Sequence, residues 1–262
     1  MQKIANILFW IGVMGVLNTV YADPLIIAHR GNSSVAPENT LAAVVSAIKL
    51  RPQPAYIEID LHRSADGVLV VSHDDNTLRT TGVDAMIRER NFSDLRQLDA
   101  GYKQKFGDAF PNEKLPRLEE VLDAVKDTPI GIMIECKQLL LEDDVIALLR
   151  KRGEINKHVI ASFDELTVYR AKQLEPAVKT LYLAAGINPT TVWRARDLKA
   201  DIIGSNKDTP LDSIALAHQA GFPAWIWTVD DPVEIQNFAN AGANGIITNI
   251  PESAIALTKT TQ

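Results

Sequence analysis

Short apolar runs alternate with stretches of helical periodicity from residue 24 onward. Eight of these runs predict strands buried on both faces, as parallel strands are: residues 25–28, 56–60, 131–135, 158–162, 179–184, 201–204, 224–228 and 245–248. The stretches after them predict eight helices, over residues 40–50, 118–126, 141–151, 164–173, 189–198, 210–219, 232–241 and 251–257. Strict alternation of eight strands with eight helices predicts an α/β fold, the (β/α)₈ or TIM barrel.

The alternation breaks once, over residues 61–117, between the second strand and its helix. Asp66-Gly67 is a turn signal, and the apolar run 68–72 after it predicts a hairpin. A connection of this length in a compact barrel is typically functional. We therefore expect a small insertion after the second strand, forming a cap beside the barrel mouth.

The first 22 residues have the pattern of a secretory signal peptide. Lys3 precedes an apolar run over residues 4–20, and Val20-Tyr21-Ala22 provides a cleavage site. An uncleaved membrane anchor is the alternative, but the run is short for a spanning helix. We expect cleavage after Ala22, a single domain over residues 23–262 without a stable membrane anchor, and a periplasmic or secreted protein.

The overall charge narrows the class of partner. The chain has 262 residues and a net charge of −6, and no run rich in Lys and Arg stands out. Nucleic acid is therefore not an expected partner. The acidity does not exclude a phosphate substrate, because a bound cation would dominate the local field.

Polar side chains stand where the predicted strands end, which is where barrel enzymes place their active sites. His29 and Arg30 end the first strand, and His73 ends the hairpin strand. The alternation of side chains along a strand puts Glu58 on the same face as Asp60, Glu135 on the same face as Lys137, and Trp225 on the same face as Trp227.

Three of these residues, Glu58, Asp60 and Glu135, are carboxylates expected to converge at one barrel mouth. Without a counter-charge they would repel one another and their pKa values would rise. Oxygen ligands of this kind suit a hard ion, so we expect one divalent cation, calcium or magnesium.

The other polar groups suit the cleavage of a phosphate ester. His29 and His73 are the expected general acid and base, because imidazole takes up and releases protons near neutral pH. Arg30 and Lys137 are expected to bind phosphate oxygens, although Lys137 alone also fits a rim position. Trp225 and Trp227 are either core aromatics or a wall of the substrate site.

The chain resembles the glycerophosphodiester phosphodiesterase family between His29 and Pro251. The resemblance is carried by His29-Arg30-Gly31, Pro37-Glu38-Asn39-Thr40, Glu58-Ile59-Asp60, Ser72-His73-Asp74, Ile134-Glu135-Cys136-Lys137 and Trp227-Thr228-Val229. It implies a (β/α)₈ barrel with a small insertion and metal-dependent hydrolysis of a glycerophosphodiester to glycerol 3-phosphate and an alcohol. It also implies acid–base roles for His29 and His73, metal binding by Glu58, Asp60 and Glu135, and substrate binding by Arg30, Lys137 and Trp227. Asp230 departs from the asparagine of many members.

Several alternatives remain open at this level. The nucleophile is either a glycerol hydroxyl of the substrate, giving a cyclic phosphate, or water. A lysophospholipase D type activity would need an apolar groove, for which Phe92, Phe106 and Phe110 of the insertion are available. A non-catalytic binder of phosphodiesters is the rival of another class, but a binder has no use for two histidines placed for proton transfer.

Overall fold

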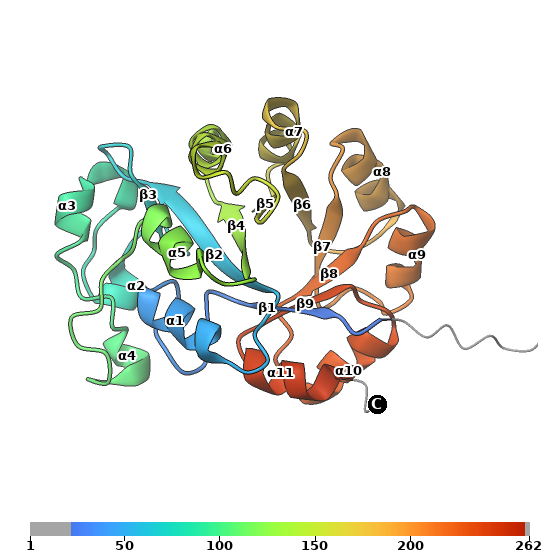
Figure 1. Ribbon diagram of the computed structural model, residues 1–262, viewed down its shortest axis with the longest axis horizontal. Coiled ribbons are helices and arrows are strands. Elements are labelled where there is room, and N and C mark those ends of the chain that lie inside the picture. The colour runs from blue at the N-terminus through green and yellow to red at the C-terminus, as the bar shows by residue number, and fades with distance from the viewer. Residues whose placement is uncertain (1–21, 260–262) are drawn as a thin grey trace, which may run out of the picture.

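The computed structural model describes residues 22–259, and these form a closed barrel of parallel strands within a ring of helices (Figure 1). The barrel strands run in the order β1-β9-β8-β7-β6-β5-β4-β2, and β1 pairs with β2 to close it. They are β1 (Leu25–Ala28), β2 (Tyr56–Arg63), β4 (Gly131–Cys136), β5 (Val159–Ser162), β6 (Lys179–Ala184), β7 (Ile202–Asn206), β8 (Ala224–Trp227) and β9 (Gly245–Thr248). The predicted barrel is confirmed.

Each helix that covers the barrel follows a barrel strand, most of them after a short connection and one after the long insertion. They are α1 (Leu41–Lys49), α5 (Leu118–Val125), α6 (Leu141–Arg152), α7 (Glu165–Leu174), α8 (Pro189–Asp197), α9 (Ser213–Gln219), α10 (Pro232–Asn240) and α11 (Pro251–Thr258). Side-chain caps fix several starts: Asp164 accepts from the Thr167 amide, and Asp231 accepts from the amides of Val233 and Glu234. Helix α9 begins three residues later than predicted, after a turn in which the Ser213 amide donates to the Pro210 carbonyl.

Side chains alternate between the two faces of each strand, as the sequence predicted. Ile57, Ile59 and Leu61 of β2 point outward and are fully buried in the layer beneath the helices. Tyr56 and Met133 belong instead to the cluster that fills the barrel interior. The polar residues of β2 that share the inward face therefore have to lie within the barrel.

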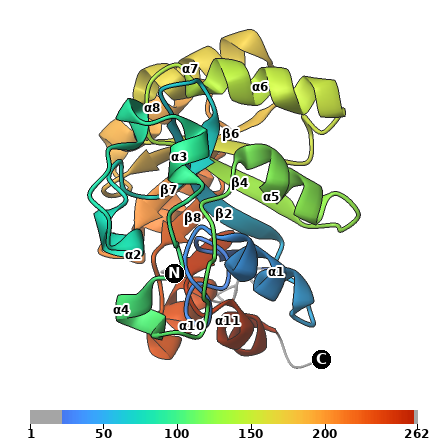
Figure 2. The same cartoon turned by 90° about the vertical axis from the view of Figure 1, so that its left-hand side faces the viewer.

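Strand β2 is longer than predicted because it continues into a hairpin. Its last three residues pair antiparallel with β3 (Leu69–Val71), with Leu61 opposite Val71. The chain then forms α2 (Leu78–Thr81), the 3-10 turn η1 (Ile87–Glu89), α3 (Phe92–Leu95) and α4 (Lys103–Phe106) before α5. Figure 2 shows these short helices spread along one flank of the barrel. A small apolar cluster packs η1 and α3 against β3, and it is made by Val70, Ile87, Leu95, Ala100 and Leu115.

Within residues 22–259 no helix has the length and apolar character needed to cross a membrane. The predicted signal peptide falls on residues 1–21 and the cleavage site beside them, so it lies outside the described residues except for Ala22.

Candidate active site

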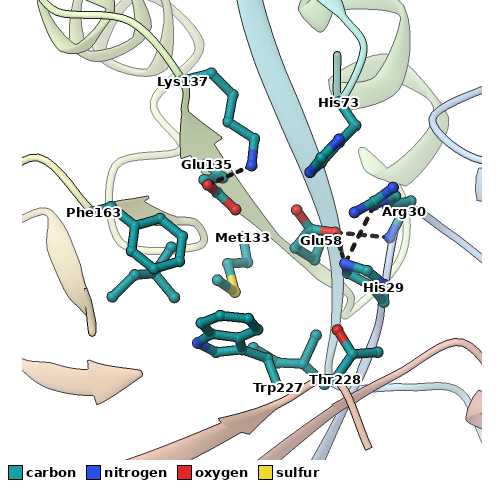
Figure 3. Close-up of a pocket in the computed structure, with 12 residues that line it drawn as sticks. His29, Arg30, Glu58, His73, Met133, Glu135, Lys137, Phe163, Trp227 and Thr228 are labelled. Carbon is teal, nitrogen blue, oxygen red and sulfur yellow. Dashed lines mark hydrogen bonds and ion pairs between the residues drawn. The ribbon is translucent and has the colours of Figure 1, made fainter. Parts of the chain in front are cut away.

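A cavity of about 230 Å³ opens at the carboxyl ends of the barrel strands (Figure 3). One side of it is polar, and the other side is apolar and aromatic. Its lining consists of His29, Arg30, Glu58, His73, Glu135 and Lys137 on the polar side, and of Met133, Phe163, Leu183, Trp227, Thr228 and Ile247 on the other.

Three carboxylates meet at the polar side because their strands are neighbours. Asp60 of β2 lies directly opposite Glu135 of β4 in the parallel ladder, and Glu58 lies two residues earlier on the same face. One oxygen from each lies within 4.8 Å of the others, a spacing that a metal ion can bridge. Glu58 is only 2% exposed and Asp60 only 1% exposed.

Burial and mutual repulsion raise the pKa values of two of these carboxylates. Burial raises the pKa of Glu58 well above its usual value, and the charges of Asp60 and Glu135 raise it further. Burial and Asp60 also raise the pKa of Glu135. Oε1 of Glu58 is buried and has no hydrogen-bond partner among the described residues. An unpartnered buried oxygen beside two more carboxylates is a donor set that could hold a metal ion.

Asp60 differs from the other two in the direction of its pKa shift, because its positive and amide partners outweigh the effect of burial. Lys137 Nζ lies 3.0 Å from Asp60 Oδ1 and 2.6 Å from Glu135 Oε1. Burial alone would raise the pKa of Asp60, but Lys137 and Arg30 outweigh it and hold that pKa below its usual value. Asn39 also donates from Nδ2 to Asp60 Oδ2 at 2.7 Å, and its own Oδ1 accepts from the Asp60 amide.

His29 follows β1 and is held in one orientation. Its Nδ1 lies 2.8 Å from Asn249 Oδ1, which can only accept, so Nδ1 carries the proton and Nε2 is left as an acceptor. Arg30 Nε donates to that Nε2 at 3.3 Å. Burial, with the positive charge of Arg30, lowers the pKa of His29 to about 4, so the imidazole is neutral at physiological pH.

His73 enters the cavity from the loop after β3, on the side opposite Trp227 (Figure 3). Its Nδ1 lies 2.7 Å from Asp74 Oδ1, which fixes the ring. Its main-chain carbonyl lies 3.0 Å from Nε2 of the buried His62, whose other ring nitrogen has no hydrogen-bond partner among residues 22–259. His62 therefore supports the position of His73 and does not join the carboxylates.

Arg79 connects the surroundings of the two histidines. Its Nε donates to Asp74 Oδ2 at 2.6 Å, and its Nη2 donates to Glu38 Oε1 at 2.7 Å. The same Glu38 oxygen accepts from Arg30 Nη1 at 2.7 Å. Burial would raise the pKa of Glu38, but Arg79 and Arg30 together lower it. A continuous series of charged contacts thus runs from His73 to His29.

Comparison with known proteins decides the family. Residues 29–253 match the glycerophosphoryl diester phosphodiesterase family. The chain belongs to that family. A glycerophosphodiester phosphodiesterase from Caldanaerobacter subterraneus subsp. tengcongensis is 30% identical over 245 residues, which cover 90% of this chain and 98% of that one.

Two solved structures of phosphodiesterases have a fold similar to that of this chain. A phosphodiesterase from Oleispira antarctica in complex with the product sn-glycerol-3-phosphate is 27% identical, with a TM-score of 0.81 over 90% of this chain and 96% of that one. A glycerophosphodiester phosphodiesterase from Agrobacterium tumefaciens is 28% identical, with a TM-score of 0.76 over 89% of this chain and 99% of that one.

The two tryptophans of β8 lie at different depths in this phosphodiesterase. Trp227 lines the cavity, and its ring lies edge-on to Phe163 at 5.4 Å. Trp225 lies one layer deeper, since two residues along a strand span about 6.6 Å, and packs on Tyr56 at 5.3 Å. It borders a separate cavity near Leu25 and Lys179, where the strands begin. Of the two alternatives for Trp225, a core aromatic or part of the substrate wall, its position fits the core aromatic.

The aromatic side chain that completes the wall was not anticipated. Phe163 follows β5 directly and is 48% exposed. The alternation Val159, Ala161, Phe163 was the signal available in the sequence, because it continues the inward face of β5 by one more position. Phe92, Phe106 and Phe110 do not line the cavity: Phe92 packs into the flank, and Phe106 lies edge-on to Phe110 at 5.5 Å.

Proposed function

We propose that this phosphodiesterase hydrolyses glycerophosphodiesters to glycerol 3-phosphate and an alcohol, using one divalent cation and the pair His29 and His73. The observation that carries the proposal is that both imidazoles border one cavity with three converging buried carboxylates. The same cavity contains Arg30 and Lys137, which supply positive charge for a phosphate group.

Glu58, Asp60 and Glu135 would hold the cation, and all-oxygen ligation favours calcium or magnesium. When bound, such an ion neutralises charge on the phosphate and on the attacking oxygen. It would also remove the repulsion that raises the pKa values of Glu58 and Glu135.

The histidines provide the proton transfers that the ester cleavage requires. One removes a proton from the nucleophile, and the other donates a proton to the oxygen of the departing alcohol. Neutral His29 presents Nε2 as an acceptor, and Asp74 orients His73 through Nδ1. The nucleophile is the neighbouring glycerol hydroxyl or a water molecule. A substrate analogue whose neighbouring hydroxyl is replaced by hydrogen separates these routes, because only direct attack by water would still cleave it.

Turnover of glycerophosphocholine, followed by release of glycerol 3-phosphate, tests the proposal. Excess chelator should abolish it, and calcium or magnesium should restore it. His29→Ala and His73→Ala should each lower kcat by on the order of 10²–10⁴. Asp108→Asn is a matched control, because this side chain is 88% exposed and lies on the outer flank. Binding of the substrate without turnover would instead establish the non-catalytic alternative.

The same assay with lysophosphatidylcholine addresses the lysophospholipase D alternative. The three phenylalanines considered for an acyl groove do not line the cavity, whereas Phe163 stands half-exposed at its edge. Cleavage of lysophosphatidylcholine at a rate equal to or above that of glycerophosphocholine would favour the alternative.

We also propose that the protein is exported and that cleavage follows Ala22, on the pattern of Lys3, the apolar run and Val20-Tyr21-Ala22. Mass spectrometry of the protein from its native host tests this. A mature chain that retains residues 1–22 would contradict it.

A further inference from the structure

A second hollow, of about 480 Å³, lies beside the catalytic cavity. His29 and Arg30 border both spaces, so the two adjoin at these residues. The second space, called here the outer groove, is otherwise lined by Ser33, Ser34, Glu38, Lys105, Asp230, Asn249 and Ile250. Unlike the catalytic cavity, it has no Phe, Tyr or Trp side chain in its lining.

The outer groove lies where a departing alcohol would be. The carboxylates Glu58 and Glu135 line only the inner cavity, so a nucleophile activated there approaches phosphorus from that side. Attacking and leaving oxygens stand roughly in line across phosphorus. With the phosphate at Arg30, the leaving oxygen then points away from the carboxylates and toward the outer groove.

The charged side chains of the outer groove differ in how free they are to bind a ligand. Glu38 is already paired with Arg30 and Arg79. Lys105 donates to the Ser33 carbonyl at 2.7 Å and lies 5.0 Å from the centre of the Phe106 ring. Asp230 is exposed, and its carboxylate accepts hydrogen bonds from three neutral donors. These donors are Thr248 Oγ1, the Asn249 main-chain amide and Asn249 Nδ2. A carboxylate offers about four acceptor positions, so one remains for a ligand.

We propose that the outer groove is the subsite for the leaving alcohol and that Asp230 selects head groups bearing a primary ammonium, such as ethanolamine. The inference rests on the proposed function of the neighbouring cavity. A primary ammonium donates hydrogen bonds to Asp230 and to neighbouring hydroxyl and amide oxygens. A trimethylammonium group cannot donate, and this lining has no Phe, Tyr or Trp whose ring face could bind it.

The test compares kcat/KM for glycerophosphoethanolamine, glycerophosphocholine and glycerophosphoglycerol, whose head groups are a primary ammonium, a quaternary ammonium and a neutral polyol. At low ionic strength the ethanolamine ester should be preferred over both others by roughly threefold or more, the size expected of one exposed charged contact. Equal values for the three esters, or a preference for choline, would overturn the assignment while leaving the proposed function intact. Absence of turnover with all three would overturn the proposed function itself.

Asp230→Asn makes the test specific to this carboxylate. Asp230 also holds Asn249, which holds His29, so the variant can slow every substrate. The readout is therefore the ratio of kcat/KM for the ethanolamine ester to that for the glycerol ester, from which a common loss cancels. Asp230→Asn should lower this ratio roughly three- to fivefold, and Lys105→Gln, which removes the opposing charge, should raise it. An unchanged ratio in Asp230→Asn would show that Asp230 only supports Asn249.

Discussion

His158 makes the stability of this protein sensitive to acid. It lies just before β5, at the end of the barrel opposite the catalytic cavity, and its side chain is fully buried. Its Nδ1 accepts a hydrogen bond from the Ile132 amide at 3.0 Å. Its Nε2 lies 3.7 Å from Glu154 Oε2, beyond hydrogen-bonding distance. A proton on Nδ1 would face the N–H of the Ile132 amide, and two donors cannot form a hydrogen bond with each other. The folded protein therefore holds a neutral imidazole.

The size of the effect follows from the pKa. Burial lowers the pKa of His158 from 6.5 to about 4, with Lys157 assisting and Glu154 opposing. Because the folded-state pKa is the lower one, the unfolded chain binds this proton first. The stabilisation is complete above pH 6.5 and is lost as the pH falls toward 4. At about 1.4 kcal/mol per pH unit, this group alone removes roughly 3 kcal/mol from the free energy of unfolding.

The matched variant is His158→Asn, whose Oδ1 can accept from the Ile132 amide but cannot titrate in this range. Urea unfolding of both proteins, in chelator and between pH 8 and pH 4, gives the free energy of unfolding of each. His29 titrates in both, so its effect cancels in the difference. The wild type should lose roughly 3 kcal/mol more than the variant over this range. Parallel curves for the two proteins would refute the reasoning.

Three further predictions concern the catalytic cavity. Glu58→Gln should abolish the rise in melting temperature that calcium or magnesium gives the wild type, because it removes a carboxylate from the set of three. Thermal unfolding with and without metal measures this rise, and an undiminished rise in the variant would exclude Glu58 as a ligand. Arg79→Met should lower kcat by up to about 100-fold with little change in melting temperature, because Arg79 positions Asp74 and Glu38. Partial recovery of kcat in Arg79→Lys would support this positioning role. Equal losses of stability and activity would count against it. Asn39→Ala should lower the free energy of unfolding by roughly 1–3 kcal/mol, because it removes the amide that donates to buried Asp60. Asn39→Gly should cost about 1 kcal/mol less, because Asn39 has a positive φ of 58°; equal costs in urea unfolding would show that the backbone conformation does not contribute.

The sequence by itself determined the barrel and the ends of most of its elements. Parallel strands buried on both faces leave continuous apolar runs, and proline or a capping side chain marks where helices begin, so both signals are local. The sequence also placed His29 and Glu135 near the carboxyl ends of their strands and put Glu58 on the same face as Asp60, since chain direction and the alternation of side chains are both local properties. The structure gathers these residues around one cavity.

Only the tertiary structure decided how deep each side chain lies in the barrel and which side chains it contacts. Trp225 and Trp227 share a face, but the position of β8 in the barrel put one in the core and the other at the mouth. Phe163 joined the wall from a strand that carried no chemical motif. The contacts of Arg79 with Glu38 and Asp74 join loops far apart in sequence. Such contacts depend on where separate loops meet above the barrel, and local patterns of apolar and polar residues do not encode that meeting.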